Sequence, residues 1–126
     1  MRFADLEEGQ EFDLDGESSL EAWYRAVRKQ EIERLSTYDL CRAVRQQLFL
    51  EHVLPVALAE LEATPAIGAT YDNQLLWALA GLEKEKLLAH PHLRTRLLAL
   101  ANGVVEGIDS DEEARKAAGT LRAKLI

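Results

Sequence analysis

The chain has 126 residues, of which 48% are hydrophobic and 29% are charged, and its formal net charge is −7. A chain of this length can bury a core without disulfide or metal support, and its apolar content excludes a disordered protein. No apolar stretch approaches the about 20 residues of a membrane-spanning helix, and the negative charge argues against direct binding to nucleic acid or to acidic membrane surfaces.

The first helix is predicted over residues 20–30. Ser18 and Glu21 match a capping box, in which two side chains satisfy free backbone amides at the start of a helix. The residues before this helix contain no apolar core of the kind found in signal peptides, so the protein is expected to stay in the cytoplasm. Apolar side chains recur at helical spacing at Leu20, Trp23, Tyr24 and Val27.

Residues 35–63 predict two further helices. Ser36 is the expected N-cap of the first, which should begin at the next residue. Pro55 has no amide hydrogen to donate, so it predicts a break or kink between residues 49 and 53. The apolar faces of the two helices are formed by Leu40, Val44 and Leu48, and by Leu54, Ala57, Leu58 and Leu61.

A turn and two short helices are expected next. The Thr-Pro pair at residues 64–65, together with Gly68, predicts the end of the third helix. Asp72 is the expected N-cap of a fourth helix. Gly81 weakens the continuation of that helix into residues 83–89, where a separate short helix can form. The fourth helix carries Leu75, Leu76 and Leu79.

Two helices are predicted in the remaining residues. Pro91 favours the first turn of one helix, because an amide hydrogen is not needed there. Gly103 and Gly107 are expected to loosen the end of that helix. A second capping box, Ser110 with Glu113, precedes the last helix. The two apolar faces comprise Leu93, Leu97, Leu100 and Val104, and Ala114, Ala117, Ala118, Leu121 and Leu125.

These segments together predict an all-α protein. No segment shows the alternation of β-branched or aromatic residues, flanked by hairpin turns, that predicts strands. We therefore expect a single compact domain over residues 1–126, built from six or seven short packed helices. The domain is expected to carry an acidic amino-terminal segment at residues 1–19.

The negative charge is concentrated at the amino terminus. Residues 1–21 contain eight acidic side chains and one arginine, whereas residues 22–126 contain 14 acidic and 14 basic side chains. The amino-terminal segment is therefore either a solvated tail that keeps the protein in solution or a surface complementary to a basic protein partner.

No group of residues predicts a catalytic, cofactor or metal site. His52, His90 and His92 with the single Cys41 do not supply four zinc ligands at compatible spacing. Cys41 lies among apolar residues and is expected to be a buried thiol, and the serines at helix starts are expected to be caps rather than nucleophiles. We expect a protein that is not an enzyme and needs no cofactor or metal.

The aromatic residues separate into two groups. Trp23, Phe49 and Trp77 fit apolar helix faces and are assigned to packing. Tyr38 and Tyr71 lie at helix starts beside acidic residues, and tyrosine is a residue type that anchors protein interfaces. These two tyrosines are the better candidates for exposed contacts.

A longer pattern lies in the order and spacing of residues between Ser18 and Leu79. Its members are Trp23 to Arg28, Leu35-Ser36 followed by Asp39-Leu40, Arg45-Gln46, Leu50 with Leu54-Pro55, Leu61, Pro65 with Gly68, and Tyr71 before Leu75-Leu76. The pattern covers about half of the chain and resembles the helical immunity proteins of bacterial contact-dependent growth inhibition systems. Asn73 and Gln74 depart from the small or acidic residues that the resemblance leads us to expect there.

The resemblance implies a cytoplasmic, noncatalytic protein that binds the carboxy-terminal domain of a cognate toxin, often a nuclease, and so protects the cell. An acidic inhibitor can be steered toward the basic cleft of a nuclease. A helical adaptor or dimerisation module without a toxin partner is the alternative. The residues expected to face the toxin are Glu7, Glu8, Glu11, Asp13, Asp15, Glu17, Tyr38, Tyr71 and Asp72.

Overall fold

The computed structural model describes residues 1–7, 19–108 and 110–126, and over these ranges the chain is all-α, as predicted. The only β-type pairing among these residues is an isolated bridge between Arg2 and Glu31. Six of the helices have at least seven residues, which agrees with the expected six or seven. The elements are α1 (Phe3–Leu6), α2 (Ser19–Val27), the 3-10 helix η1 (Ile32–Arg34), α3 (Thr37–Arg45), α4 (Leu50–Ala63), α5 (Gln74–Ala80), α6 (Lys84–Leu88), α7 (Pro91–Glu106) and α8 (Glu112–Leu125).

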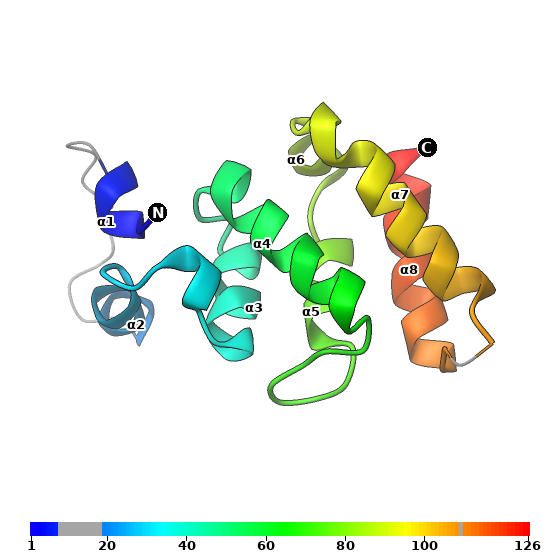
Figure 1. Cartoon of the computed structure of the whole chain (residues 1–126), viewed down its shortest axis with the longest axis horizontal. Helices are drawn as coiled ribbons and strands as arrows, with labels where there is room; N and C mark the ends of the chain where they lie inside the picture. The colour runs from blue at the N-terminus through cyan, green and yellow to red at the C-terminus, as the bar shows by residue number, and fades with distance from the viewer. Residues whose placement is uncertain (8–18, 109) are drawn as a thin grey trace.

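The longer helices form two layers (Figure 1). Helices α4 and α7 lie in front of α3, α5 and α8 in this view, and α4 packs against both α3 and α7. Helix α5 lies between α3 and α8 and contacts both. Helices α1 and α2 lie at the amino-terminal end of the molecule, opposite the α7–α8 pair, so α3, α4 and α5 occupy its middle.

The core is rich in leucine and runs through both layers. The apolar faces predicted for α3 and α4 are buried, and Cys41 is fully buried among them, as expected. Trp23, Phe49 and Trp77 are partly buried and pack against the core, which confirms their assignment to packing. The largest fully buried side chains are Phe3, Ile32, Leu40, Leu54, Leu58, Leu61, Leu75, Leu76, Leu79, Leu87, Leu97 and Leu121.

The break between α3 and α4 lies earlier in the chain than Pro55 predicts. Gln47 and Phe49 adopt left-handed backbone conformations, with φ of 57° and 44°, and α4 begins directly after them. Helix α4 then continues through Pro55. The proline removes a single backbone hydrogen bond, to the carbonyl of Glu51, and the buried side chains on either side of Pro55 hold the helix together.

Helix α2 ends three residues before the predicted boundary because other backbone groups take its hydrogen bonds. The Arg28 carbonyl accepts a hydrogen bond from the Ala4 amide at 2.9 Å instead of from the amide of Ile32. Ile32 in turn donates to the carbonyl of Met1, also at 2.9 Å. The sequence therefore did not predict α1 or η1. Ser18, the expected cap of α2, lies outside the described residues.

Phe3 explains why α1 is attached to the rest of the protein. Its ring is fully buried and stacks against Tyr24 and Phe49, with ring centroids 5.9 and 5.8 Å apart. These two partners come from α2 and from the α3–α4 connection. Burial of an aromatic side chain of this size contributes about 2–3 kcal/mol of hydrophobic free energy. This contribution allows a helix of only four residues to persist.

The predicted cap of α3 and the predicted first-turn proline of α7 are confirmed, whereas two other predicted caps are wrong by one residue. The Ser36 hydroxyl accepts a hydrogen bond from the Asp39 amide at 3.1 Å, and Pro91 is the first residue of α7. Helix α8 is capped by Asp111 instead of Ser110, because the Asp111 carboxylate accepts from the Ala114 amide at 2.7 Å.

At the start of α5 the residue before the helix is Asn73 and not Asp72. Asn73 has φ of 66° and makes no side-chain cap. Its side-chain amide instead donates a hydrogen bond to the carboxylate of Asp111, the N-cap of α8, at 3.3 Å. Helix α7 also continues through Gly103 and ends only at Gly107. Within the described ranges, no helix is long and apolar enough to cross a membrane.

Candidate protein-binding surface

Six of the nine residues predicted to face a partner belong to the acidic amino-terminal segment, and only Glu7 is among the described residues. Its carboxylate accepts hydrogen bonds from the Arg28 guanidinium and from the Tyr24 hydroxyl, each at 2.8 Å. The side chain of Glu7 is 16% exposed. Arg28, assisted by Tyr24, holds the pKa of the Glu7 carboxyl below its ordinary value of 4.5. Glu7 therefore fastens the end of α1 to α2, and Arg28 balances its charge.

The other five acidic residues predicted to face a partner lie outside the described part of the chain. They are Glu8, Glu11, Asp13, Asp15 and Glu17.

Tyr38 belongs to an exposed face of α3. Tyr38, Arg42 and Arg45 recur at intervals of four and three residues, so they lie on one side of the helix. Tyr38 is 42% exposed, and its hydroxyl accepts a hydrogen bond from Arg42 at 3.3 Å. The Arg42 guanidinium also lies 5.1 Å from the centre of the Trp23 ring, whose indole N–H donates to Asp39 at 2.8 Å. We call Tyr38, Arg42 and Arg45 the α3 stripe.

Tyr71 and Asp72 are presented by the loop between α4 and α5. Both are exposed, and Tyr71 is 52% exposed. The loop is held by Gln74, whose buried side-chain carbonyl accepts hydrogen bonds from the amides of Ala69 and Thr70 at 2.8 and 2.9 Å. Two turn amides are thus satisfied by one buried side chain, so Tyr71 projects from an ordered loop.

Asn73 ties the same loop to two other parts of the protein. Its backbone amide donates to the carbonyl of Ala66 at 2.9 Å, while its side chain reaches Asp111 at the start of α8. Asn73 and Gln74 are the two buried polar residues among those described. Sequence reasoning did not identify this role. The available signal was their departure from the residues expected at these positions.

Gly68 allows the two sides of this loop to approach each other. A β-carbon at this position would lie 1.8 Å from the backbone oxygen of Tyr71, a separation that no side-chain rotation can relieve. Replacing Gly68 with alanine is therefore expected to force the backbone around Tyr71 to move. The expected cost is about 1–3 kcal/mol of unfolding free energy, measured by urea denaturation.

Gly119 provides a matched control for this substitution. It lies within α8, and a β-carbon there would have no heavy atom within 4 Å apart from the nearby backbone of its own helix. Gly119→Ala should raise the unfolding free energy by about 0.5–1 kcal/mol, because alanine is the better helix former. A Gly68→Ala protein that is as stable as the wild type would show that the loop can open at no cost.

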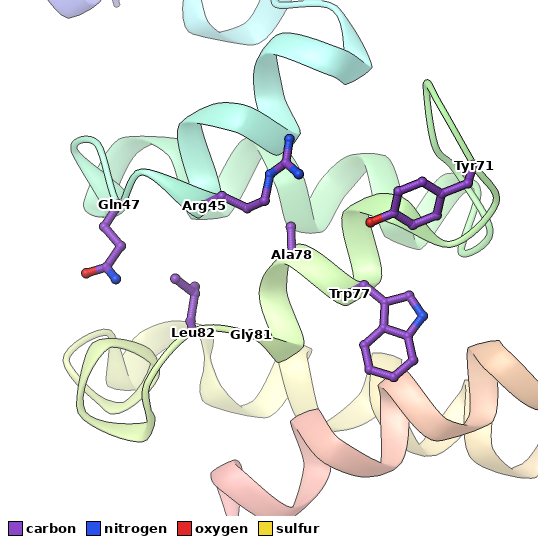
Figure 2. A pocket seen from close by; sticks show the side chains of 7 residues that line it. All are labelled: Arg45, Gln47, Tyr71, Trp77, Ala78, Gly81 and Leu82. Carbon is purple, nitrogen blue, oxygen red and sulfur yellow. The ribbon is translucent and has the colours of Figure 1, made fainter. Parts of the chain in front are cut away.

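A hollow connects Tyr71 to the α3 stripe (Figure 2). Arg45 reaches it from the carboxy-terminal end of α3, and Tyr71 reaches it from the α4–α5 loop on the other side of Ala78. The hydroxyl of Tyr71 is turned toward Ala78 and Arg45. The hollow is open to solvent and has a volume of about 190 Å³. Its lining residues are Arg45, Gln47, Tyr71, Trp77, Ala78, Gly81 and Leu82.

Some arginines of the protein form ion pairs, whereas within the described ranges the arginines of the α3 stripe, like Arg34, Arg94, Arg115 and Arg122, do not. Arg25, Arg28 and Arg96 each form an ion pair with a glutamate. Within the described ranges, Arg42 and Arg45 pair with no carboxylate. The hollow therefore combines the aromatic side chains of Tyr71 and Trp77 with the Arg45 guanidinium, which pairs with no carboxylate of the described residues.

The remaining candidate groups do not converge on a site in the described part of the chain. The His90 and His92 rings meet edge to face with their centres 6.2 Å apart, and burial lowers the pKa of His90. Burial raises the pKa of the Cys41 thiol, which disfavours the reactive thiolate. Among the described residues, no three His, Cys, Asp or Glu side chains are placed to hold a metal ion.

Comparison with known protein families identifies a relationship that covers most of the chain. Residues 6–97 match the family model described as CDI immunity proteins. The matched range includes the α3 stripe, the α4–α5 loop and every residue of the hollow, and it ends within α7. A search of curated proteins finds no match.

Proposed function

The chain belongs to the family of contact-dependent growth inhibition (CDI) immunity proteins, and we propose that the toxin domain it neutralises is a basic nuclease bound in the cytoplasm. Membership of the family implies a toxin-neutralising function. The acidic amino-terminal segment is the observation that supports the nuclease. A nuclease binds the phosphate backbone through clustered Lys and Arg, and such a surface attracts a concentrated block of carboxylates.

In this proposal the protein inhibits the toxin by binding to its surface and does not catalyse a reaction. Proteins of this family are typically noncatalytic, and two potential nucleophiles of this chain have structural roles: Cys41 is buried and Ser36 caps α3. Glu8, Glu11, Asp13, Asp15 and Glu17 would meet the basic surface of the toxin, and Tyr38, Tyr71 and Asp72 would add contacts from the described part of the molecule. Glu7 would contribute through its attachment of α1 to α2.

Coexpression with the toxin domain tests the proposal. The gene next to the one for this chain is expected to encode a large secreted protein whose carboxy-terminal domain is the toxin, and a metabolic operon there would count against the proposal. Cells that produce this protein should survive expression of the toxin domain, and the two proteins should copurify; cells with an unrelated immunity protein should die. Death of the cells despite a folded inhibitor would overturn the proposed pairing.

The nuclease part is tested separately with purified components. The toxin domain should degrade RNA or DNA in a test tube, and an equimolar amount of this protein should stop the degradation. Toxicity without any loss of nucleic acid would refute the nuclease while leaving the immunity function intact. Sedimentation of the protein alone measures self-association, which the alternative of a dimerisation module requires.

A further inference from the structure

We propose that the hollow between α3 and the α4–α5 loop binds a carboxylate of the toxin domain, supplied by an exposed Asp or Glu and held by Arg45 and Tyr71. This inference rests on the proposed function and adds a second contact of opposite charge to it. The partner is a protein segment with one acidic side chain and apolar neighbours.

The charge of Arg45 is the first argument. Arg45 is exposed at the rim of the hollow, and within the described ranges it forms no ion pair and no side-chain hydrogen bond. A guanidinium group presents N–H donors in a plane that matches the two oxygens of a carboxylate. An acidic side chain of the partner would supply the opposite charge that Arg45 does not find among the described residues.

The shape and lining of the hollow provide the second argument. Trp77, Ala78 and Leu82 form apolar walls beside Arg45, while Tyr71 directs its hydroxyl toward the same space. The walls fit the methylene groups of an Asp or Glu side chain, and the hydroxyl can donate to its carboxylate. Exclusion of water by a docked partner would strengthen the ion pair, because the local dielectric falls.

The rigidity of both sides is the third argument. Gln74 holds the loop that carries Tyr71. Ser36 caps α3, and Arg42 rests over Trp23 one turn before Arg45. The backbone on both sides of the hollow is therefore already in position, so binding has to order little more than the Arg45 side chain, and more of the contact energy remains as affinity.

The hollow would also give the complex a defined register. A block of carboxylates attracts any basic surface. Arg45, in contrast, forms an ion pair only with a partner that has an acidic side chain at the matching position. A toxin without that acid would bury Arg45 unpaired, which costs affinity. The two contacts therefore have different effects. The acidic segment increases the rate of association, and the hollow increases the affinity for the correct toxin relative to other toxins.

Arg45→Glu and Lys29→Glu form the test pair. Both substitutions change the net charge by the same amount, and Lys29 is exposed two residues after the end of α2 and does not line the hollow. Binding of each variant to the purified toxin domain is followed by surface plasmon resonance. We expect Arg45→Glu to raise the dissociation rate at least about 30-fold and Lys29→Glu to change it less than about 3-fold. Equal effects of the two variants would overturn the proposal.

Two further variants keep the test independent of folding defects. Tyr71→Phe removes only the hydroxyl and should weaken binding about 3- to 10-fold. Arg45→Glu should recover affinity with a toxin variant in which one exposed Asp or Glu is replaced by Arg, and this rescue would identify the acid. If no such exchange restores binding, or if the wild type dimerises through the hollow and Arg45→Glu abolishes that dimer, the proposal is wrong. A wild-type protein that does not bind the toxin at all would instead refute the proposed function.

Discussion

Replacing Leu121 with alanine is expected to lower the free energy of unfolding by about 2–5 kcal/mol. Leu121 is fully buried in α8, which packs against α5, α6 and α7. Truncation to alanine removes apolar contacts and leaves a cavity that rigid helices fill only in part. Urea denaturation followed by circular dichroism measures the loss. Thr120→Ala is the matched control, since Thr120 is exposed on the same helix and its replacement should not destabilise the protein but add at most about 0.7 kcal/mol through the higher helix propensity of alanine.

The same substitution tests whether residues 1–126 form one domain, which we propose from the contacts of α8. Lys124 donates a hydrogen bond to the carbonyl of Leu82 at 2.8 Å, and Asp111 accepts from Asn73. Both contacts join the last helix to the middle of the molecule, although the family match ends before that helix. The loss of stability caused by Leu121→Ala should therefore extend to the amino-terminal helices.

The two tryptophans report the two regions separately. With Trp77 replaced by Phe, fluorescence follows Trp23 in α2, and with Trp23 replaced by Phe it follows Trp77 in α5. In one domain, Leu121→Ala should lower the free energy of unfolding by the same amount in both single-tryptophan backgrounds. A shift at Trp77 alone would divide the protein into two units and refute the single domain.

Local sequence patterns predicted the helices because the formation and capping of a helix depend mainly on residues a few positions apart. The apolar spacing of Leu40, Val44 and Leu48 describes one helix face whatever surrounds it, and Ser36 caps α3 through its own third neighbour. The predictions that failed depended on distant residues. Asn73 makes its side-chain hydrogen bonds to Asp111 instead of capping α5, and no pattern around position 73 encodes that partner.

The candidate surface could be predicted only in part for the same reason. The exposure of Tyr38 and Tyr71 agrees with their positions at helix starts. The hollow could not be foreseen, because Arg45, Tyr71 and Trp77 come from three segments that the fold brings together. Glu7 illustrates the opposite case: its sequence position suggested a free acid, and its pairing with Arg28 depends on the docking of α1.

Neutralising the acidic segment should slow association with the toxin by about 10- to 1000-fold at low salt. The variant replaces Glu8, Glu11, Asp13, Asp15 and Glu17 with the corresponding amides and keeps Glu7, because loss of the Glu7–Arg28 pair would disturb α1. Steering by a concentrated charge acts before contact, so the association rate should fall and its dependence on salt should flatten. Stopped-flow fluorescence at several salt concentrations measures both quantities.

A second variant with the same net charge separates a local effect from a global one. It replaces five exposed glutamates outside the segment, Glu60, Glu83, Glu85, Glu106 and Glu112, with glutamine. If both variants slow association equally, total charge and not the segment steers the encounter. If neither does, the segment is a solubilising tail and the argument for a basic toxin surface fails.

The dissociation rate distinguishes the contribution of the acidic segment from that of the hollow. Charges that act mainly before contact change the association rate, whereas a desolvated ion pair changes the dissociation rate. The five-residue neutralisation should therefore leave dissociation nearly constant, while Arg45→Glu should increase it. Combined in one protein, the two changes should add as free energies, because they affect separate steps and separate surfaces. Strong coupling between them would place the segment against Arg45 in the complex and would contradict a division of the interface into a steering part and a register part.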